Sequence, residues 1–348
     1  MGVSLQRAAY AQTARSIAEP VAGQSVSRRR PAGNVFFRRQ HQGVSILPGR
    51  KISAALQKPP LAQTALQFKK RTVAPGLVLV RRSALSASSG KDLSDGWAVN
   101  FAVGCTHGCR FCYVDRIWRL HSKNKLSPLY GAELGEWGQY LHVPGGLEGQ
   151  IRRTPWRRWS GVRVLMSSTH DPYLPELYFP HRWPRRILEA ALPHGVKFTI
   201  LTRSALPTQD FDLYAKYRDQ ITLMSSIPTL DDAFAKMTEP RAPPPSARLA
   251  MLKKAKEAGI PIGVVVAPII IRRGWREDLE RLFSALAELG PSAVYGELLH
   301  ARGLNLARLK AVGVEPRVGS AADREVGRAF EELLKRYGLR GAYWYEYS

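Results

Sequence analysis

The chain's three cysteines are its only thiols, and they fall within eight residues. Cys105, Cys109 and Cys112 give the spacing C-x3-C-x2-C within the segment GCTHGCRFCY. A short glycine-containing loop can wrap around a small inorganic centre and offer backbone N–H groups to its sulfurs. Iron–sulfur clusters usually take four thiolates, so three leave one iron open to a substrate or cofactor. The spacing predicts an iron–sulfur cluster with an open iron.

Zinc is the competing metal, with His107 as the fourth ligand of a Cys3His site. Structural zinc sites normally draw their ligands as two separated pairs, whereas these four residues lie in one loop. Three reduced cysteines that bind no metal would be expected at scattered positions, not within eight residues of one another. We therefore favour iron, and the alternative is a zinc-containing, non-catalytic nucleic-acid-binding protein.

The elements that must position this loop follow it in a regular alternation. Apolar β-rich runs predict strands, and helical spacing of apolar residues predicts helices between them. The expected strands are Trp97–Val103, Val162–Met166, Lys197–Leu201, Ile221–Ser225, Ile262–Ala267 and Ala293–Gly296, and the expected helices are Tyr113–His121, Pro184–Leu192, Phe211–Lys216, Ser246–Ala258 and Arg276–Leu289. Six β-α alternations predict an α/β fold with a parallel sheet, open or closed, whose strands carry the chemistry at their carboxyl ends.

Charge and proline content divide the chain into three parts. Residues 1–70 are proline-punctuated and basic, and residues 1–90 hold 15 Lys and Arg against one acidic residue, Glu19. We expect 1–70 to be a disordered basic extension: a targeting segment, a nucleic-acid arm or a segment without a specific role. The core is expected over 71–296, with an insertion at about 122–160. A C-terminal extension with one helix, Ala322–Tyr337, is expected over 297–348.

Overall composition narrows the class of protein further. A hydrophobic fraction of 45% can fill a core, and no apolar run is long enough to span a membrane. Three cysteines are too few for a disulfide framework, which favours a reducing compartment, the cytoplasm, with organelle targeting by the basic N-terminus as the alternative. A net charge of +24 suits a polyanionic partner, and Trp156-Arg-Arg-Trp159 offers rings beside charges for nucleic acid.

The cysteine motif, with an aromatic residue before its last cysteine, resembles that of the radical S-adenosylmethionine (SAM) superfamily. The resemblance covers roughly residues 75–300, and this part of the chain is similar to the branch related to spore photoproduct lyase, a DNA-repair enzyme. The segments that carry it are Met166-Ser-Ser-Thr-His-Asp-Pro-Tyr173, Ile200-Leu-Thr-Arg-Ser204, Ser225-Ser-Ile-Pro-Thr-Leu-Asp231, Glu239-Pro-Arg-Ala-Pro243 and Gly259-Ile-Pro-Ile-Gly-Val-Val-Val-Ala-Pro-Ile269.

The resemblance implies a partial (β/α)6 TIM-like barrel and two cofactors. A [4Fe–4S] cluster would be held by the three cysteines, and SAM would lie across the strand ends. Reductive cleavage of SAM would give a 5′-deoxyadenosyl radical that abstracts hydrogen from a substrate. The implied partner is an electron donor, a reductase or a flavodoxin- or ferredoxin-type protein. The residues that would contact SAM are Tyr113, Ser167, Ser168, Thr169, Arg203, Ser225 and Ser226.

Most of these cofactor contacts have a structural alternative. The serine-rich triplet could be a turn ahead of Asp171-Pro172, Arg203 a surface residue, and Tyr113 a core residue. His170 and Asp171 are candidates for acid–base chemistry on a substrate or for a turn. Glu239 and Arg241 would reach the ribose or substrate, or would form an ion pair that holds their loop.

One departure from the photoproduct lyase pattern limits the chemistry. Photoproduct lyase is understood to use a further cysteine as hydrogen-atom donor, and this sequence has no fourth cysteine. The same absence disfavours an auxiliary cluster of the kind used in sulfur insertion. The sequence assigns no catalytic residue and no substrate, with nucleic acid as one candidate.

Overall fold

The computed structural model describes residues 79–81, 92–123 and 134–346. The expected extension over 1–70 lies outside these residues. Eight strands form one sheet in the order β1-β2-β5-β6-β7-β8-β9-β10. All neighbours from β2 to β10 are parallel, and β1 pairs antiparallel with β2. Their bounds are β1 Leu79–Arg81, β2 Trp97–Val99, β5 Arg163–Met166, β6 Lys197–Thr202, β7 Ile221–Ser226, β8 Ile262–Ile269, β9 Val294–Leu298 and β10 Gly341–Tyr343.

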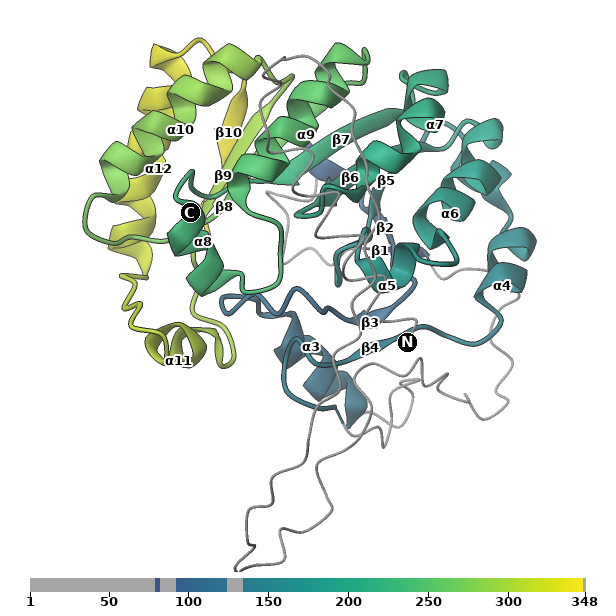
Figure 1. The fold of residues 1–348 in the computed structure, drawn as a ribbon, viewed down its shortest axis with the longest axis horizontal. Coiled ribbons are helices and arrows are strands. Elements are labelled where there is room, and N and C mark those ends of the chain that lie inside the picture. The colour runs from purple at the N-terminus through teal and green to yellow at the C-terminus, as the bar shows by residue number, and fades with distance from the viewer. Residues whose placement is uncertain (1–78, 82–91, 124–133, 347–348) are drawn as a thin grey trace, which may run out of the picture.

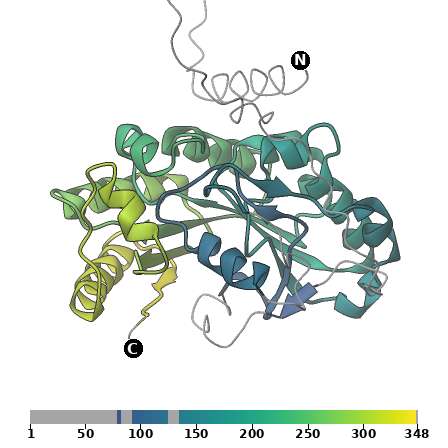
Figure 2. The same cartoon turned by 90° about the horizontal axis from the view of Figure 1, so that it is seen from below.

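Helices cover the outer face of this curved sheet, and two of them lie below its carboxyl ends in Figure 1. The lower pair is α3 and α11, and Figure 2 views the molecule from that side. The helices are α3 Val114–Ser122, α4 Leu147–Arg153, α5 Pro175–Tyr178, α6 Trp183–Ala191, α7 Phe211–Lys216, α8 Asp232–Thr238, α9 Pro245–Glu257, α10 Trp275–Leu289, α11 Asn305–Lys310 and α12 Ser320–Arg336.

Both faces of the sheet are apolar, as parallel strands require. Alternate residues of the strands pack outward on the helices, as Val164 and Met166 do. The intervening residues, among them Leu165, Met224 and Val265, form a second cluster on the concave inner face. An α/β sheet curved into part of a barrel, the fold expected from the sequence, is confirmed.

The predicted elements agree with the structure to within a few residues, with one break. The expected strand over Trp97–Val103 ends at Val99, and Val103–Gly104 forms a separate strand, β3, antiparallel to β4 at Leu141–His142. Gly104 has φ +94°, and a Cβ there would collide with the Tyr140 carbonyl. The chain leaves the sheet here to begin the cysteine loop.

The C-terminal part contains more structure than the one expected helix. That helix is α12, but α11 precedes it, and β10 adds a seventh parallel strand beside β9. Within the described residues, none of the helices is both long and apolar enough to cross a membrane.

The Trp156-Arg-Arg-Trp159 segment does not offer two open rings. It forms a short 3-10 helix just ahead of β5, at the amino end of the sheet. Trp156 is 3% exposed and its indole N–H donates to the Ile151 carbonyl at 3.0 Å. Trp159 is half-buried and meets Trp97 edge-on. The hypothesis that Trp156 stacks on a nucleic-acid base is wrong, because that ring is in the core.

Candidate active site

The cysteine loop begins where β3 ends and runs to the start of α3. Cys105 and Cys109 are buried, and Cys112 is half-buried. Burial raises the pKa of all three thiols, that of Cys105 to about 12, although N–H groups of His107 and Asp171 facing Cys105 oppose the rise. Metal binding would therefore displace a proton from each thiol. Among the described residues, no three His, Cys, Asp or Glu side chains converge on a position for a single metal ion.

Asn100, directly after β2, joins that strand to the end of β5. Its Oδ1 accepts from the Ser167 hydroxyl at 2.7 Å and from the Ser168 N–H at 2.8 Å, and its Nδ2 donates to the Ser168 hydroxyl at 3.0 Å. The Thr169 N–H donates to the Ser167 hydroxyl at 3.2 Å, while the Thr169 hydroxyl is buried with no hydrogen-bond partner among the described residues. The serine-rich triplet is thus a turn held by hydrogen bonds, and its Thr169 hydroxyl is available to a ligand.

His170 lies behind this turn rather than in an open site. Its ring meets Phe101 edge-on, with the ring centres 4.7 Å apart, and its Nδ1 lies 3.0 Å from the Ser167 hydroxyl. Burial lowers the pKa of His170 to about 3, so the ring is neutral at physiological pH. Acid–base chemistry on a substrate is poorly served by a neutral, buried ring of this kind.

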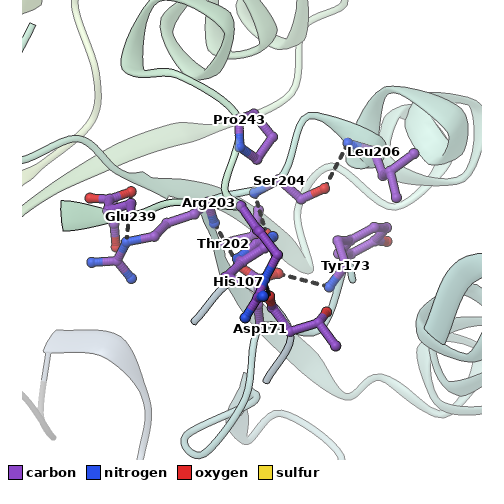
Figure 3. Close-up of polar contacts among 12 residues, drawn as sticks. His107, Asp171, Tyr173, Thr202, Arg203, Ser204, Leu206, Glu239 and Pro243 are labelled. Atoms are coloured by element: carbon purple, nitrogen blue, oxygen red, sulfur yellow. Dashed lines mark hydrogen bonds and ion pairs between the residues drawn. The ribbon is translucent and has the colours of Figure 1, made fainter. Parts of the chain in front are cut away.

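The Asp171 carboxylate connects the cysteine loop with the end of β6 (Figure 3). It accepts from the Thr202 hydroxyl at 2.6 Å, the Arg203 N–H at 2.7 Å and the Tyr173 N–H at 2.9 Å. Its other contact is His107 Nδ1, at 3.4 Å. Burial lowers the pKa of His107, so this ring is neutral as well. Asp171 therefore holds three segments in register.

Arg203 faces the cysteine loop from the end of β6. Its guanidinium lies over the Phe111 ring, donates to the Ala267 carbonyl at 2.8 Å, and approaches Glu239 to 3.5 Å. Burial disfavours the charged form of Arg203 and so lowers its pKa. Glu239 and the nearby cysteines have the opposite effect, and together they hold the pKa of Arg203 above its usual value. Arg203 is therefore a cation placed beside the cysteines, not a surface residue.

Glu239 is paired with Arg248, not with Arg241. Arg248 is fully buried; it donates to Glu239, to the Pro243 carbonyl at 2.8 Å and to the Ser226 carbonyl at 2.9 Å. Burial opposes the charge of Glu239, but Arg248 and then Arg203 lower its pKa. The carboxylate thus stays charged between two guanidinium groups.

The remaining residues that were predicted to contact SAM differ in how deeply they are buried. The Ser225 hydroxyl donates to the Thr202 carbonyl of the neighbouring strand at 3.0 Å, and Ser226 is buried beside it. Tyr113 is 43% exposed, and the Arg302 guanidinium carbon lies 5.4 Å from its ring centre. Tyr113 is therefore at the rim, and not in the core.

The residues present fit a polar cofactor at these strand ends. Five buried polar atoms there have no hydrogen-bond partner among the described residues: His107 Nε2, Thr169 Oγ1, His170 Nε2, Arg203 Nε and Glu239 Oε1. An unmet buried polar group costs about 1–3 kcal/mol, so it calls for a missing partner. Three neighbouring thiols and a guanidinium complete a donor set suited to a cluster with an amino-acid ligand.

Sequence reasoning missed Asn100 and Arg248, although each left a signal. Asn100 is the first polar residue after an apolar strand. Arg248 shares a helix face with Leu252 and Ala255, four and seven residues later, so it is a charged residue in an apolar stripe. Such a residue is buried only when it is paired.

The family of the chain follows from comparison with known proteins. The model of the radical SAM superfamily matches residues 99–286, more than half of the chain, and the chain belongs to this superfamily. An uncharacterized protein, ORF301 of Acidianus two-tailed virus, is 49% identical over 262 residues, which cover 74% of this chain and 85% of that protein.

Spore photoproduct lyase is similar in both sequence and fold. The Bacillus subtilis (strain 168) enzyme is 27% identical over 218 residues, 63% of this chain and 58% of that protein. A structure of spore photoproduct lyase complexed with dinucleoside spore photoproduct has a TM-score of 0.51 at 17% identity, covering 79% of this chain and 80% of that one. The shared architecture is the α/β fold of radical SAM enzymes.

Proposed function

We propose that this protein is an enzyme whose Cys105, Cys109 and Cys112 hold a [4Fe–4S] cluster and whose strand ends bind SAM. When bound and given one electron, these cofactors supply cleavage of the SAM S–C5′ bond to methionine and a 5′-deoxyadenosyl radical that abstracts a hydrogen atom from a substrate. The observation that carries the proposal is the set of three thiols beside unpartnered buried polar atoms at the sheet's carboxyl edge.

The chain's own residues would bind and orient SAM. Arg203 offers a guanidinium suited to a carboxylate, and Thr169 offers a buried hydroxyl that suits an amino group. Ser167 and Ser168 hold the turn that presents it. Ser225 and Ser226 close the adjoining wall, and Tyr113 covers the outer edge. Burial of these groups would keep water and stray hydrogen donors from a reactive radical.

The electron would enter from a reductase or a flavodoxin- or ferredoxin-type donor. Cys112 is the most exposed of the three cysteines. Arg308 donates to the Cys112 carbonyl and pairs with Asp115. Arg302 lies over the ring of the next residue, Tyr113, and pairs with Glu346, so the surface near Cys112 carries charges of both signs.

Nucleic acid is the substrate class that we propose, in the manner of photoproduct lyase. The similarity to that enzyme and the net charge of +24 support it. With no fourth cysteine in the sequence, the hydrogen returned to a product radical would come from another group than a cysteine thiol.

Anaerobic reconstitution tests the reaction. Protein incubated with iron and sulfide, then reduced by dithionite with SAM, should be brown and should release 5′-deoxyadenosine, measured by chromatography. Cys109→Ala should abolish this release, whereas Met237→Ala, an exposed residue of α8, should not. A colourless protein that holds one zinc per chain would contradict the proposal and favour the nucleic-acid-binding alternative.

The substrate class needs its own measurement. Deuterium-labelled oligonucleotides of one sequence, ultraviolet-irradiated or untreated, are added to the reconstituted protein with SAM and dithionite. Repair of the lesion, or transfer of deuterium from the oligonucleotide into 5′-deoxyadenosine, would support nucleic acid. SAM cleavage without either effect would limit the conclusion to a radical SAM enzyme with another substrate.

A further inference from the structure

The carbonyl groups of the cysteine loop accept hydrogen bonds from side chains of three distant segments. Arg241 Nε donates to the Thr106 carbonyl and Trp137 Nε1 to the Cys109 carbonyl. From α11, Arg308 donates to the carbonyls of Arg110 and Cys112, and Asn305 Nδ2 donates to that of Phe111. We call Trp137, Arg241, Asn305 and Arg308 the carbonyl collar.

The contacts of the carbonyl collar fix which way the peptide groups of the cysteine loop point. Its carbonyls are engaged from outside, while N–H groups of His107 and Asp171 face the Cys105 sulfur and that of Val114 faces the Cys112 sulfur. N–H groups directed at thiolate sulfurs stabilise the negative charge of a cluster and help to set its potential. Fixing the outward carbonyls is therefore one way to keep the N–H groups turned inward.

Arg308 occupies the centre of this arrangement. It contacts two loop carbonyls and Asp115, its Nη1 lying 3.3 Å from Asp115 Oδ2. The next residue, Leu309, is fully buried in the same apolar cluster as Cys109 and Phe111. The short helix is thus held to the loop by its packing as well as by its polar contacts.

Arg241 is fitted between two glycines. A Cβ at Gly108, in the loop, or at Gly138 would collide with the Arg241 guanidinium. Arg241 also donates to the Gly138 carbonyl. The glycine between His107 and Cys109 therefore leaves room for this guanidinium as well as adopting φ +61°.

We propose that the carbonyl collar, including Arg308 and Asn305 beyond the residues 99–286 matched by the superfamily model, is part of the cluster-binding site. Its members are positioning residues: they shape the loop, and its two guanidinium groups favour the more negative, reduced cluster. The inference rests on the proposed function, because it presumes a cluster on the three cysteines.

The test compares four full-length variants with wild-type protein after anaerobic reconstitution. Arg308→Gln removes the charge and the two-pronged donor, Arg308→Lys keeps the charge alone, and Arg241→Gln removes the second guanidinium. Lys310→Gln is the matched control, since that lysine lies on the same helix and pairs with Glu315 at 3.7 Å on the surface. The readouts are iron and sulfide per chain, loss of iron to a chelator, the midpoint potential, the electron paramagnetic resonance spectrum of the reduced cluster, and melting of the apoprotein.

Arg308→Gln should lose iron to the chelator about 10- to 100-fold more readily, the usual effect of removing a residue that orients metal ligands. Its midpoint potential should become more negative, and Arg308→Lys should lie between it and wild type. Lys310→Gln should match wild type.

A cluster of wild-type content, potential and spectrum in both Arg308→Gln and Arg241→Gln would overturn the inference while leaving the proposed function intact. Failure of wild-type protein to take up a cluster would refute the proposed function itself. Should the Arg308→Gln apoprotein not fold, Arg241→Gln decides by the same readouts.

Discussion

His170 shows how a single buried ring can make this protein sensitive to acid. The folded protein holds it neutral, with a pKa of about 3 against an ordinary value of 6.5. Between those two values the unfolded chain binds a proton at this position and the folded chain does not. Stability must therefore rise with pH across that window, and fall as the solution is acidified.

Replacing His170 with Gln should remove this acid sensitivity. The variant should be less stable than wild type at pH 7, because the contact with Phe101 is lost. The difference should shrink by about 1.6 kcal/mol between pH 6.5 and pH 5, because the unfolded histidine is half protonated at pH 6.5 and the slope approaches 1.36 kcal/mol per unit only below it. Urea unfolding of the apoproteins at several pH values measures it, with His121→Gln on exposed α3 as control. A gap independent of pH would show that His170 is charged in the folded state.

At the scale of elements, the ion pair of Glu239 and Arg248 ties the loop between α8 and α9 to the ends of β6 and β7. Glu239 is 1% exposed and Arg248 is fully buried, with the carboxylate also near Arg203. A charge at such depth is tolerated because it is paired and hydrogen-bonded.

Glu239→Gln should destabilise the apoprotein by about 3–5 kcal/mol, since it leaves the Arg248 charge uncompensated in the interior. The matched control is Glu325→Gln. That glutamate also meets two arginines, Arg276 and Arg317, but at the surface, where an ion pair contributes about 0–1 kcal/mol. Chemical denaturation of both variants gives the comparison. Equal losses would mean that burial does not set the value of the Glu239 pair.

Local patterns predict those elements whose apolar residues recur at a clear helical or strand spacing. Strands such as β8 and helices such as α10 show their periodicity in the sequence, and the predicted bounds agree with the observed ones. The six-residue α11 and three-residue β10 are defined by partners far along the chain, so no local period reveals them. The cysteine motif was visible because its cysteines are close together in the sequence, whereas the contacts of Arg308 with the loop span 196 residues or more.

At the scale of the whole molecule, the sheet is an open barrel with two edges, and the Trp344 side chain lies across the gap between them. β1 and β10 stand at opposite ends of the strand order and are not paired. Trp344, directly after β10, is 4% exposed, stacks on Tyr295 and donates its indole N–H to Asp92 Oδ2 at 2.7 Å. It packs with Leu93 and other residues of the concave inner face. The C-terminal aromatic segment therefore bridges the open side of the partial barrel.

Trp344→Ala should cost about 3–5 kcal/mol of stability, as expected for deleting a large buried aromatic side chain. Trp344→Phe should cost less, because a ring remains to stack on Tyr295 and the change chiefly removes the bond to Asp92. Thermal and urea unfolding of the two variants separates these contributions. Wild-type stability in Trp344→Ala would mean that the sheet's two ends are held by other contacts.

The wide separation of the loop from its collar has a bearing on the order of events during biosynthesis. Arg308 contacts the carbonyl of Cys112, 196 residues earlier in the chain. While those residues are still being added, Trp137 and then Arg241 are already present, but Asn305 and Arg308 are not. The cysteine loop therefore gains its full set of side-chain contacts only after α11 has been synthesised, and a cluster of the kind proposed would find the complete site only in the finished chain.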